Sequence, residues 1–240
     1  DSVHVQLEAM KLAFADVYRF VADVRSMEGP PSMLLDAHYL ASRAKLIDPT
    51  RAQVFGAGYG IRGGTIYLSA ADESGMMVSF IQSNYMGFGS GVVEPTFGIS
   101  LQNRGAGFSL DAKHPNVVAP GKRPRSSMVP TMIFDAKGRP LVAYGSPGGS
   151  TIINSVFNVT LNLLDHGMTI QDAIDAPRLS VTATGSTINV DNGAPGSKFT
   201  GFSSTALAGL TALGYTVNPP ADIGSVQAVV VDPRSGRQYG

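Results

Sequence analysis

The sequence contains no cysteine, and its four histidines are scattered at positions 4, 38, 114 and 166. A disulfide scaffold and a thiolate-bound metal site are therefore excluded, and we expect neither a metal ion nor an organic cofactor. Lysine plus arginine and aspartate plus glutamate each number 18, so no excess charge points to nucleic acid or an anionic membrane as a partner. No apolar run approaches the roughly 20 residues that cross a bilayer.

The 240 residues are 43% hydrophobic and 15% charged, a composition typical of a folded protein with a sizeable core. The chain begins at Asp1, with neither a methionine nor a signal-peptide pattern. We expect it to be a piece of a longer protein, which leaves its compartment unassigned.

Hydrophobic spacing predicts helices first and then mostly strands. Apolar residues at three- and four-residue steps from Leu7 to Val21 indicate an amphipathic helix, and a second helix is expected over 35–46. Residues 51–64 are rich in glycine and predict a loop. This order favours an α+β fold in which helical layers cover the sheets. Further helices are expected over 151–166, 170–175 and 203–213, and strands over 65–72, 76–83, 98–103, 132–135, 141–144, 179–181, 187–190 and 226–231.

The sequence Gly63-Gly64-Thr65 stands directly before the first predicted strand. If the bond before Thr65 were cut, this threonine would carry a nucleophilic hydroxyl and a basic α-amine in one residue. The α-amine has an unperturbed pKa of about 7.7–8.0, which suits proton transfer at neutral pH. Gly64 allows the strained backbone that attack of the Thr65 hydroxyl on its carbonyl requires.

A second candidate is the segment Gly145–Gly149, with Ser146 and Pro147, between a predicted strand and a predicted helix. Backbone N–H groups at a helix N-terminus are unpaired, and glycines let a substrate carbonyl approach them. Gly148 and Gly149 therefore fit an oxyanion hole. Taken alone, the segment fits a glycine-rich turn without a ligand equally well.

Serine hydroxyls supply the remaining candidates. Ser126 and Ser127 offer donors and acceptors to a polar substrate, although paired serines in a loop are usually only solvated. Ser83 ends the strand predicted to pair with that of Thr65, so it is placed to orient the nucleophile. Its position alone favours an ordinary strand-end serine.

Together these elements resemble the γ-glutamyltranspeptidase family of N-terminal nucleophile (Ntn) hydrolases. In that family a precursor cuts itself before a threonine, and the resulting large and small subunits stay together in an αββα four-layer sandwich. The resemblance implies that Thr65 is the nucleophile, 1–64 the end of the large-subunit region and 65–240 the small-subunit region. Order and spacing agree over nearly the whole chain, through residues 7–16, 64–72, 87–91, 122–128, 145–149 and 176–178.

The same resemblance assigns roles to the other candidates. It implies that Gly148 and Gly149 form the oxyanion hole, that Ser126 and Ser127 contact the acyl carboxylate, and that Ser83 binds the nucleophile. The expected partners are a small-molecule amide, the rest of the large subunit and, after self-cleavage, the other half of a heterodimer or higher oligomer. Neither nucleic acid nor a membrane is implied.

Two positions depart from the family pattern. Tyr85 stands where typical members have asparagine, and the adjacent Asn84 is a candidate to compensate. Gly107 replaces the aspartate that pairs with the α-amine of a γ-glutamyl group, and Arg104 replaces a glutamine. Because arginine recognises carboxylates, we expect Arg104 to favour an anionic acyl group without an amine, such as glutaryl.

Three interpretations of function therefore remain open. One is an autoprocessing amidase or acyltransferase that acts on γ-glutamyl or glutaryl-type amides through an acyl-enzyme. Another is a cephalosporin acylase-type amidase that does not use γ-glutamyl substrates. The third is a non-catalytic binding protein of the same fold, in which Thr65 is never released as an N-terminus.

Overall fold

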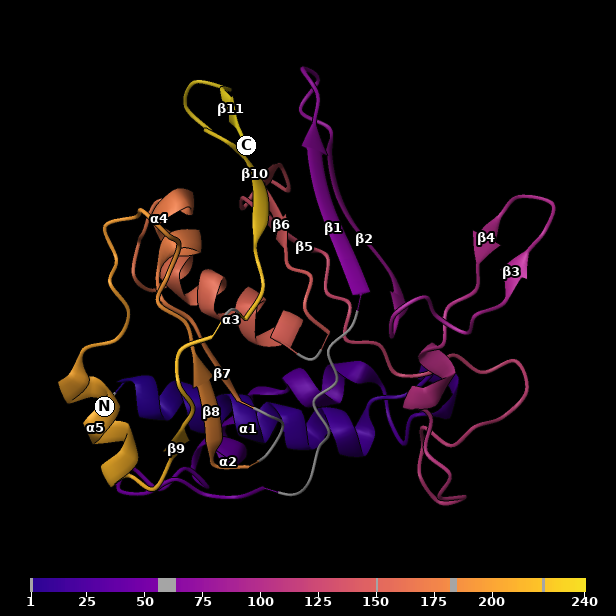
Figure 1. Ribbon diagram of the computed structural model, residues 1–240, viewed down its shortest axis with the longest axis horizontal. Coiled ribbons are helices and arrows are strands. Elements are labelled where there is room, and N and C mark those ends of the chain that lie inside the picture. The colour runs from indigo at the N-terminus through magenta and orange to yellow at the C-terminus, as the bar shows by residue number, and fades with distance from the viewer. Residues whose placement is uncertain (1, 56–63, 150, 182–184, 222) are drawn as a thin grey trace.

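The computed structural model describes residues 2–55, 64–149, 151–181, 185–221 and 223–240. Two helices come first, a run of strands follows, and helices and strands are mixed in the last part of the chain; together they build packed layers (Figure 1). The helices are α1 (Ser2–Phe20), α2 (Ala37–Ala44), α3 (Thr151–Leu164), α4 (Ile170–Asp175) and α5 (Ser204–Ala212), with 3₁₀ turns η1 (Val24–Ser26), η2 (Pro31–Leu35) and η3 (Arg104–Gly107).

The strands form four separate sheets in the described part of the chain. One is the hairpin β1–β2, and the largest has the order β11-β10-β6-β5. Two smaller sheets have the orders β3-β4 and β7-β8-β9. The strand bounds are β1 (Gly64–Ala71), β2 (Met77–Tyr85), β3 (Val93–Glu94), β4 (Ile99–Ser100), β5 (Thr131–Phe134), β6 (Pro140–Gly145), β7 (Leu179–Val181), β8 (Thr187–Val190), β9 (Thr216–Val217), β10 (Gln227–Val231) and β11 (Gln238–Tyr239).

Local sequence explains where several helices begin and end. The side chains of Asp36, Thr169 and Ser203 each accept a hydrogen bond from a backbone N–H in the first turn of α2, α4 and α5. Such N-caps satisfy donors that a helix start leaves unpaired. Gly214 follows α5 with a φ of 92°, a conformation that glycine adopts without strain.

The β1–β2 hairpin packs on the four-stranded sheet. The ring of Tyr67 in β1 lies against Gly145 at the end of β6, where any side chain would collide with it. Behind that sheet, Ile152, Val156 and Val159 of α3 form a core with Tyr144 of β6. The chain thus supplies two β layers and one helical layer of the expected sandwich (Figure 1). The outer hairpin face leaves Ile66, Leu68, Val78 and Phe80 between 45% and 62% exposed.

A second core joins the two ends of the chain. Leu7, Met10 and Phe14 of α1 are buried with apolar residues of β7, β8 and α5. The stripe of α1 predicted from its periodicity is therefore the face that this core buries. The members from later in the chain are Leu179, Val181, Ile188, Val190, Leu210 and Tyr215.

Buried charges also fasten α1 to the rest of the molecule. Glu8 and Lys11 are both fully buried and form an ion pair of 2.5 Å. Glu8 accepts a hydrogen bond of 2.5 Å from the hydroxyl of Tyr215, and Lys11 donates one of 2.5 Å to the carbonyl of Gln53. Burial lowers the pKa of Lys11, and its contact with Glu8 opposes that shift.

The sequence predicted most elements, and one predicted strand is shorter than expected. Of residues 98–103, only Ile99–Ser100 form a strand; Leu101 still exchanges backbone hydrogen bonds with Ser90 and Val92, and the chain enters η3 at Arg104. The short strands β3, β9 and β11 were not predicted, since two-residue strands carry no periodic signal. The predicted loop 51–64 has no helix or strand over 51–55, and residues 56–63 lie outside the described part.

Candidate functional site

Thr65 lies near the start of β1 and is 9% exposed. Its hydroxyl donates a hydrogen bond of 3.0 Å to Oγ of Ser83, its register partner in β2. The same Oγ accepts the backbone N–H of Tyr85 at 2.9 Å. Hairpin pairing therefore brings the predicted nucleophile and its predicted partner into direct contact, as strand alternation places facing residues on one side of a sheet.

Tyr85 adopts an unusual backbone conformation beside this pair. Its φ of 76° is positive, which is costly for a bulky residue and often marks a functional site. The turn directs its N–H to Ser83 and places its ring 4.8 Å from the guanidinium carbon of Arg104. Arg104 is only 7% exposed, and burial lowers the pKa of its guanidinium group. Tyr85 thus links Thr65 to the predicted acyl-recognition residue.

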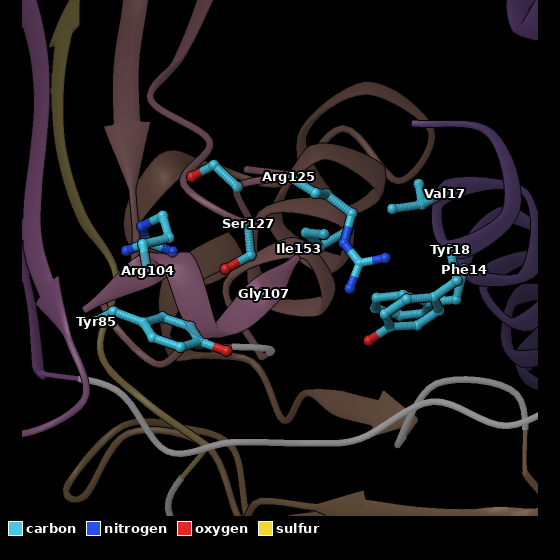
Figure 2. Close-up of a pocket in the computed structure, with 10 residues that line it drawn as sticks. Phe14, Val17, Tyr18, Tyr85, Arg104, Gly107, Arg125, Ser127 and Ile153 are labelled. Atoms are coloured by element: carbon cyan, nitrogen blue, oxygen red, sulfur yellow. The ribbon is translucent and has the colours of Figure 1, made fainter. Parts of the chain in front are cut away.

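A pocket opens next to this linkage, as Figure 2 shows. Four residues that the sequence singled out line it together, namely Tyr85, Arg104, Ser126 and Ser127. Gly107 also lines it and offers no side chain to a ligand. Apolar residues from α1 and α3 form part of the wall, namely Phe14, Val17 and Ile153.

The structure places Asn84 elsewhere. It lines a second hollow with Ile66, Gln82, Ser83 and residues 99–102, and it is not among the residues that line the pocket of Arg104. Successive residues of a strand point to opposite faces, so Asn84 lies opposite Ser83. Of these two neighbouring residues, Tyr85 lines the pocket of Arg104 and Asn84 does not.

Gly148 and Gly149 lie between β6 and α3, with φ values of 138° and 65°. Both conformations favour glycine. A Cβ on Gly148 would collide with Oγ1 of Thr151, which donates a hydrogen bond to the Gly148 carbonyl at 2.9 Å. The starts of β1 and α3 lie at the same end of the β layers (Figure 1). This geometry fits an oxyanion loop near the N-terminal end of β1, where Thr65 lies.

A buried network that the sequence did not predict supports this loop. Arg178 pairs with Asp191 at 3.0 Å, and both side chains are 9% exposed. Its guanidinium also donates to the carbonyl of Gly224 and to Oγ of Ser155. Gly224 lies against the backbone of Pro147, where a Cβ would come within 2.8 Å of its carbonyl oxygen. Arg178 therefore braces the segment that precedes Gly148.

Sequence reasoning also missed the second cation of the pocket. Arg125 was not among the predicted site residues, yet it lines the pocket and its guanidinium carbon lies 4.1 Å from the ring centre of Tyr18 in α1. Neither residue carries a local signal, because the contact joins distant parts of the sequence.

In the parts of the chain that the structure describes, no group of three or more histidines or carboxylates could hold a metal ion. The helices described there are also too short or too polar to cross a membrane.

Comparison with known proteins shows the family. The sequence profile described as gamma-glutamyltranspeptidase matches residues 1–240. The chain belongs to the γ-glutamyltranspeptidase family. A relative from Bacillus subtilis subsp. natto, named glutathione hydrolase proenzyme, is 31% identical over 97% of the chain and 42% of its own length. An oxamate amidohydrolase proenzyme from Klebsiella pneumoniae is 40% identical over 74% of the chain and 33% of its own length.

Solved structures of the γ-glutamyltranspeptidase family agree with the fold. The cephalosporin acylase from Bacillus halodurans superposes with a TM-score of 0.86 and 37% identity, over 98% of this chain and 42% of that chain. The γ-glutamyltranspeptidase of Pseudomonas nitroreducens, complexed with L-DON, has a TM-score of 0.60 and 29% identity over 72% of this chain and 92% of its own. This member of the family thus spans less than half the length of the curated relatives it matches. Its mixed helix-and-sheet architecture is that of part of an Ntn hydrolase.

Proposed function

We propose that this chain is the catalytic part of a self-processing amide hydrolase whose nucleophile is Thr65. The observation that carries the proposal is the 3.0 Å hydrogen bond between Thr65 and Ser83 beside the pocket of Arg104, in a chain of this family. Ser83 fixes the hydroxyl rotamer of Thr65. Tyr85 connects that hydroxyl to the pocket that would receive the acyl group.

In the proposed maturation, the Thr65 hydroxyl attacks the carbonyl of Gly64 and forms an ester as the peptide C–N bond breaks. Water then hydrolyses the ester and leaves Thr65 with a free α-amine. In catalysis this amine accepts the hydroxyl proton and later delivers it to the leaving amine. The N–H groups of Gly148 and Gly149 stabilise the oxyanion, and water or a competing amine accepts the acyl group from Thr65.

The proposal divides the chain at the same bond. Residues 1–64 would be the end of the large-subunit region and residues 65–240 the small-subunit region. The P. nitroreducens chain covers 72% of this one, close to the share that residues 65–240 make up, which supports the boundary. Contacts such as Glu8 with Tyr215, and the 3.1 Å bond from the N–H of Arg123 to Asp23, would hold the two parts together as a heterodimer.

The substrate proposed for this site is an amide whose acyl group carries a carboxylate and no α-amine. Arg104 presents a buried cation in the pocket, and Gly107 leaves no carboxylate there to pair with an ammonium group. Guanidinium groups bind carboxylates and repel ammonium groups. Among the relatives, the names cephalosporin acylase and oxamate amidohydrolase fit such substrates.

Two matched chromogenic substrates test this proposal on the full-length protein. We expect glutaryl p-nitroanilide to be hydrolysed with a kcat/KM at least about tenfold above that of γ-glutamyl p-nitroanilide, because the glutaryl group keeps the carboxylate that Arg104 would bind and lacks the ammonium group that Arg104 would repel. Replacement of Arg104 by glutamine should remove most of this difference. A preference for the γ-glutamyl substrate would instead assign the activity of the glutathione hydrolases.

Replacement of Ser83 by alanine should lower kcat by about ten- to a hundredfold, because a mispositioned nucleophile loses the benefit of orientation. KM should change little, since Ser83 contacts Thr65 rather than the pocket wall. Steady-state kinetics on the glutaryl substrate measure both parameters. Ser79→Ala is the matched control, because Ser79 lies in the same strand and binds Tyr67 at 2.8 Å. Equal losses in both variants, or a rise in KM alone, would contradict this role.

A further inference from the structure

The pocket beside Thr65 contains two guanidinium groups at separate points. Arg104 lies over the ring of Tyr85 at 4.8 Å, and Arg125 lies over the ring of Tyr18 at 4.1 Å. Figure 2 shows the two cations on opposite sides of the pocket, with Ser127 between them. The Arg104 side is the one nearer Thr65. The ring of Tyr85 lies against Arg104, and the backbone N–H of Tyr85 donates a hydrogen bond to Ser83, the partner of Thr65. The pocket therefore has a near and a far cation.

Neither cation is neutralised by a carboxylate within the described residues, where no ion pair includes Arg104 or Arg125. Burial lowers the pKa of both guanidinium groups, yet arginine stays charged at any physiological pH. Desolvated charges without a counter-ion are costly, and aromatic faces offset only part of that cost. A ligand with anionic groups at both points would remove it.

The buried side chain of Asn116 connects the two backbone segments that carry Arg104 and Arg125. The side-chain oxygen of Asn116 accepts the backbone N–H of Arg125 at 3.2 Å, and its NH₂ group donates to the carbonyl of Gly107 at 2.8 Å. Asn116 is 1% exposed, so this bridge between the far cation and η3 is shielded from water. On the other side, the imidazole of His114 binds the backbone carbonyl of Tyr18 at 3.0 Å. The backbone positions from which the two arginines enter the pocket are thus held together before a ligand binds.

We infer that the site takes acyl groups that carry two carboxylates, with Arg104 binding the one nearer the scissile bond and Arg125 the farther one. The inference rests on the proposed function. It narrows the substrate class from acyl groups with one free carboxylate to acyl groups with two. Glutaryl amides then fill half of the recognition site. Arg125 is the residue that distinguishes the two classes.

The test compares glutaryl p-nitroanilide with 4-carboxyadipoyl p-nitroanilide, the 4-monoanilide of butane-1,2,4-tricarboxylic acid, which keeps the carboxylate at the distance found in glutaryl and adds one beyond it. In the full-length enzyme we expect kcat/KM to be at least about tenfold higher for the dicarboxylate, since each charge-assisted contact is among the stronger hydrogen bonds. Arg125→Leu should reduce this ratio to one or below. Arg123→Leu is the matched control. It removes the same charge two residues away from Arg125, and the side chain of Arg123 is 77% exposed. The ratio should survive that change.

Calorimetric binding of butane-1,2,4-tricarboxylate and glutarate provides a readout that does not depend on turnover. Tighter binding of the tricarboxylate, lost in Arg125→Leu and kept in Arg123→Leu, supports the inference even if catalysis fails. Absence of hydrolysis with both substrates would overturn the proposed function alone. A wild-type ratio near one, or a ratio unchanged by Arg125→Leu, would overturn the dicarboxylate site while leaving the amidase intact.

Discussion

Replacement of Thr65 by alanine should leave the full-length polypeptide in one piece and abolish amide hydrolysis. Alanine cannot attack the Gly64 carbonyl, so no free α-amine forms, and the nucleophile of the second reaction is missing as well. Loss of a nucleophile in other acyl-transfer enzymes costs on the order of 10⁶ in rate. Denaturing mass spectrometry should show two fragments that meet at Gly64 and Thr65 in the wild type and one species in the variant.

Thr65→Ser is the matched control, because it keeps the hydroxyl that bonds to Ser83 and loses only a methyl group. It should still be cut, more slowly, and should retain measurable hydrolysis. A wild-type protein that stays uncut under all conditions would support the non-catalytic alternative, in which the fold serves only to bind a ligand. Cleavage at another bond would remove Thr65 from the mechanism.

Gly148→Ala should lower kcat/KM by about a hundred- to a thousandfold, the usual cost of losing an oxyanion-hole donor. A Cβ at this position would collide with Oγ1 of Thr151, and the φ of 138° is strained for any residue except glycine. The loop would have to move, and its N–H groups would no longer point at the developing charge. Steady-state kinetics on preprocessed enzyme, with fragment masses as a check on maturation, measure this loss.

Gly138→Ala provides the control for backbone strain alone. Gly138 lies in the turn between β5 and β6 with a φ of 77° and open space around it. This variant should lose some stability, on the order of 1 kcal/mol, and keep its rate constants. If both variants lost activity equally, the effect would come from general destabilisation and not from the oxyanion loop.

Elements with one buried face could be predicted from the sequence. The stripe of α1, the alternation of the β1–β2 hairpin and the spacing in α3 all follow from burial against a core, so their bounds came within a few residues. The strand over 98–103 is shorter than predicted, because beyond Leu101 the backbone N–H of Asn103 bonds to Asn84 of β2 and the chain turns into η3. Tertiary contacts of this kind leave no periodic trace.

The residues of the candidate site also differ in whether the local sequence indicates them. Thr65, Gly148 and Gly149 were recognisable because glycines and a hydroxyl at strand and helix starts have a chemical meaning of their own. Arg125 was not recognisable, since its role depends on Tyr18, which reaches it from a helix far away in the sequence. Asn84 does not line the pocket of Arg104, so its role in binding substrate stays a prediction.

The core that α1 shares with β7, β8 and Tyr215 has a thermodynamic consequence for a protein cut before Thr65. Leu7, Met10 and Phe14 would then belong to one polypeptide, and most of the side chains that bury them to another. Residues 65–240 would keep the core around Tyr144 and α3, but neither piece alone could bury the apolar residues of the shared core, so completion of the fold would require association. The uncut precursor folds in a concentration-independent step, whereas renaturation of the separated fragments would be a second-order process whose yield rises with protein concentration.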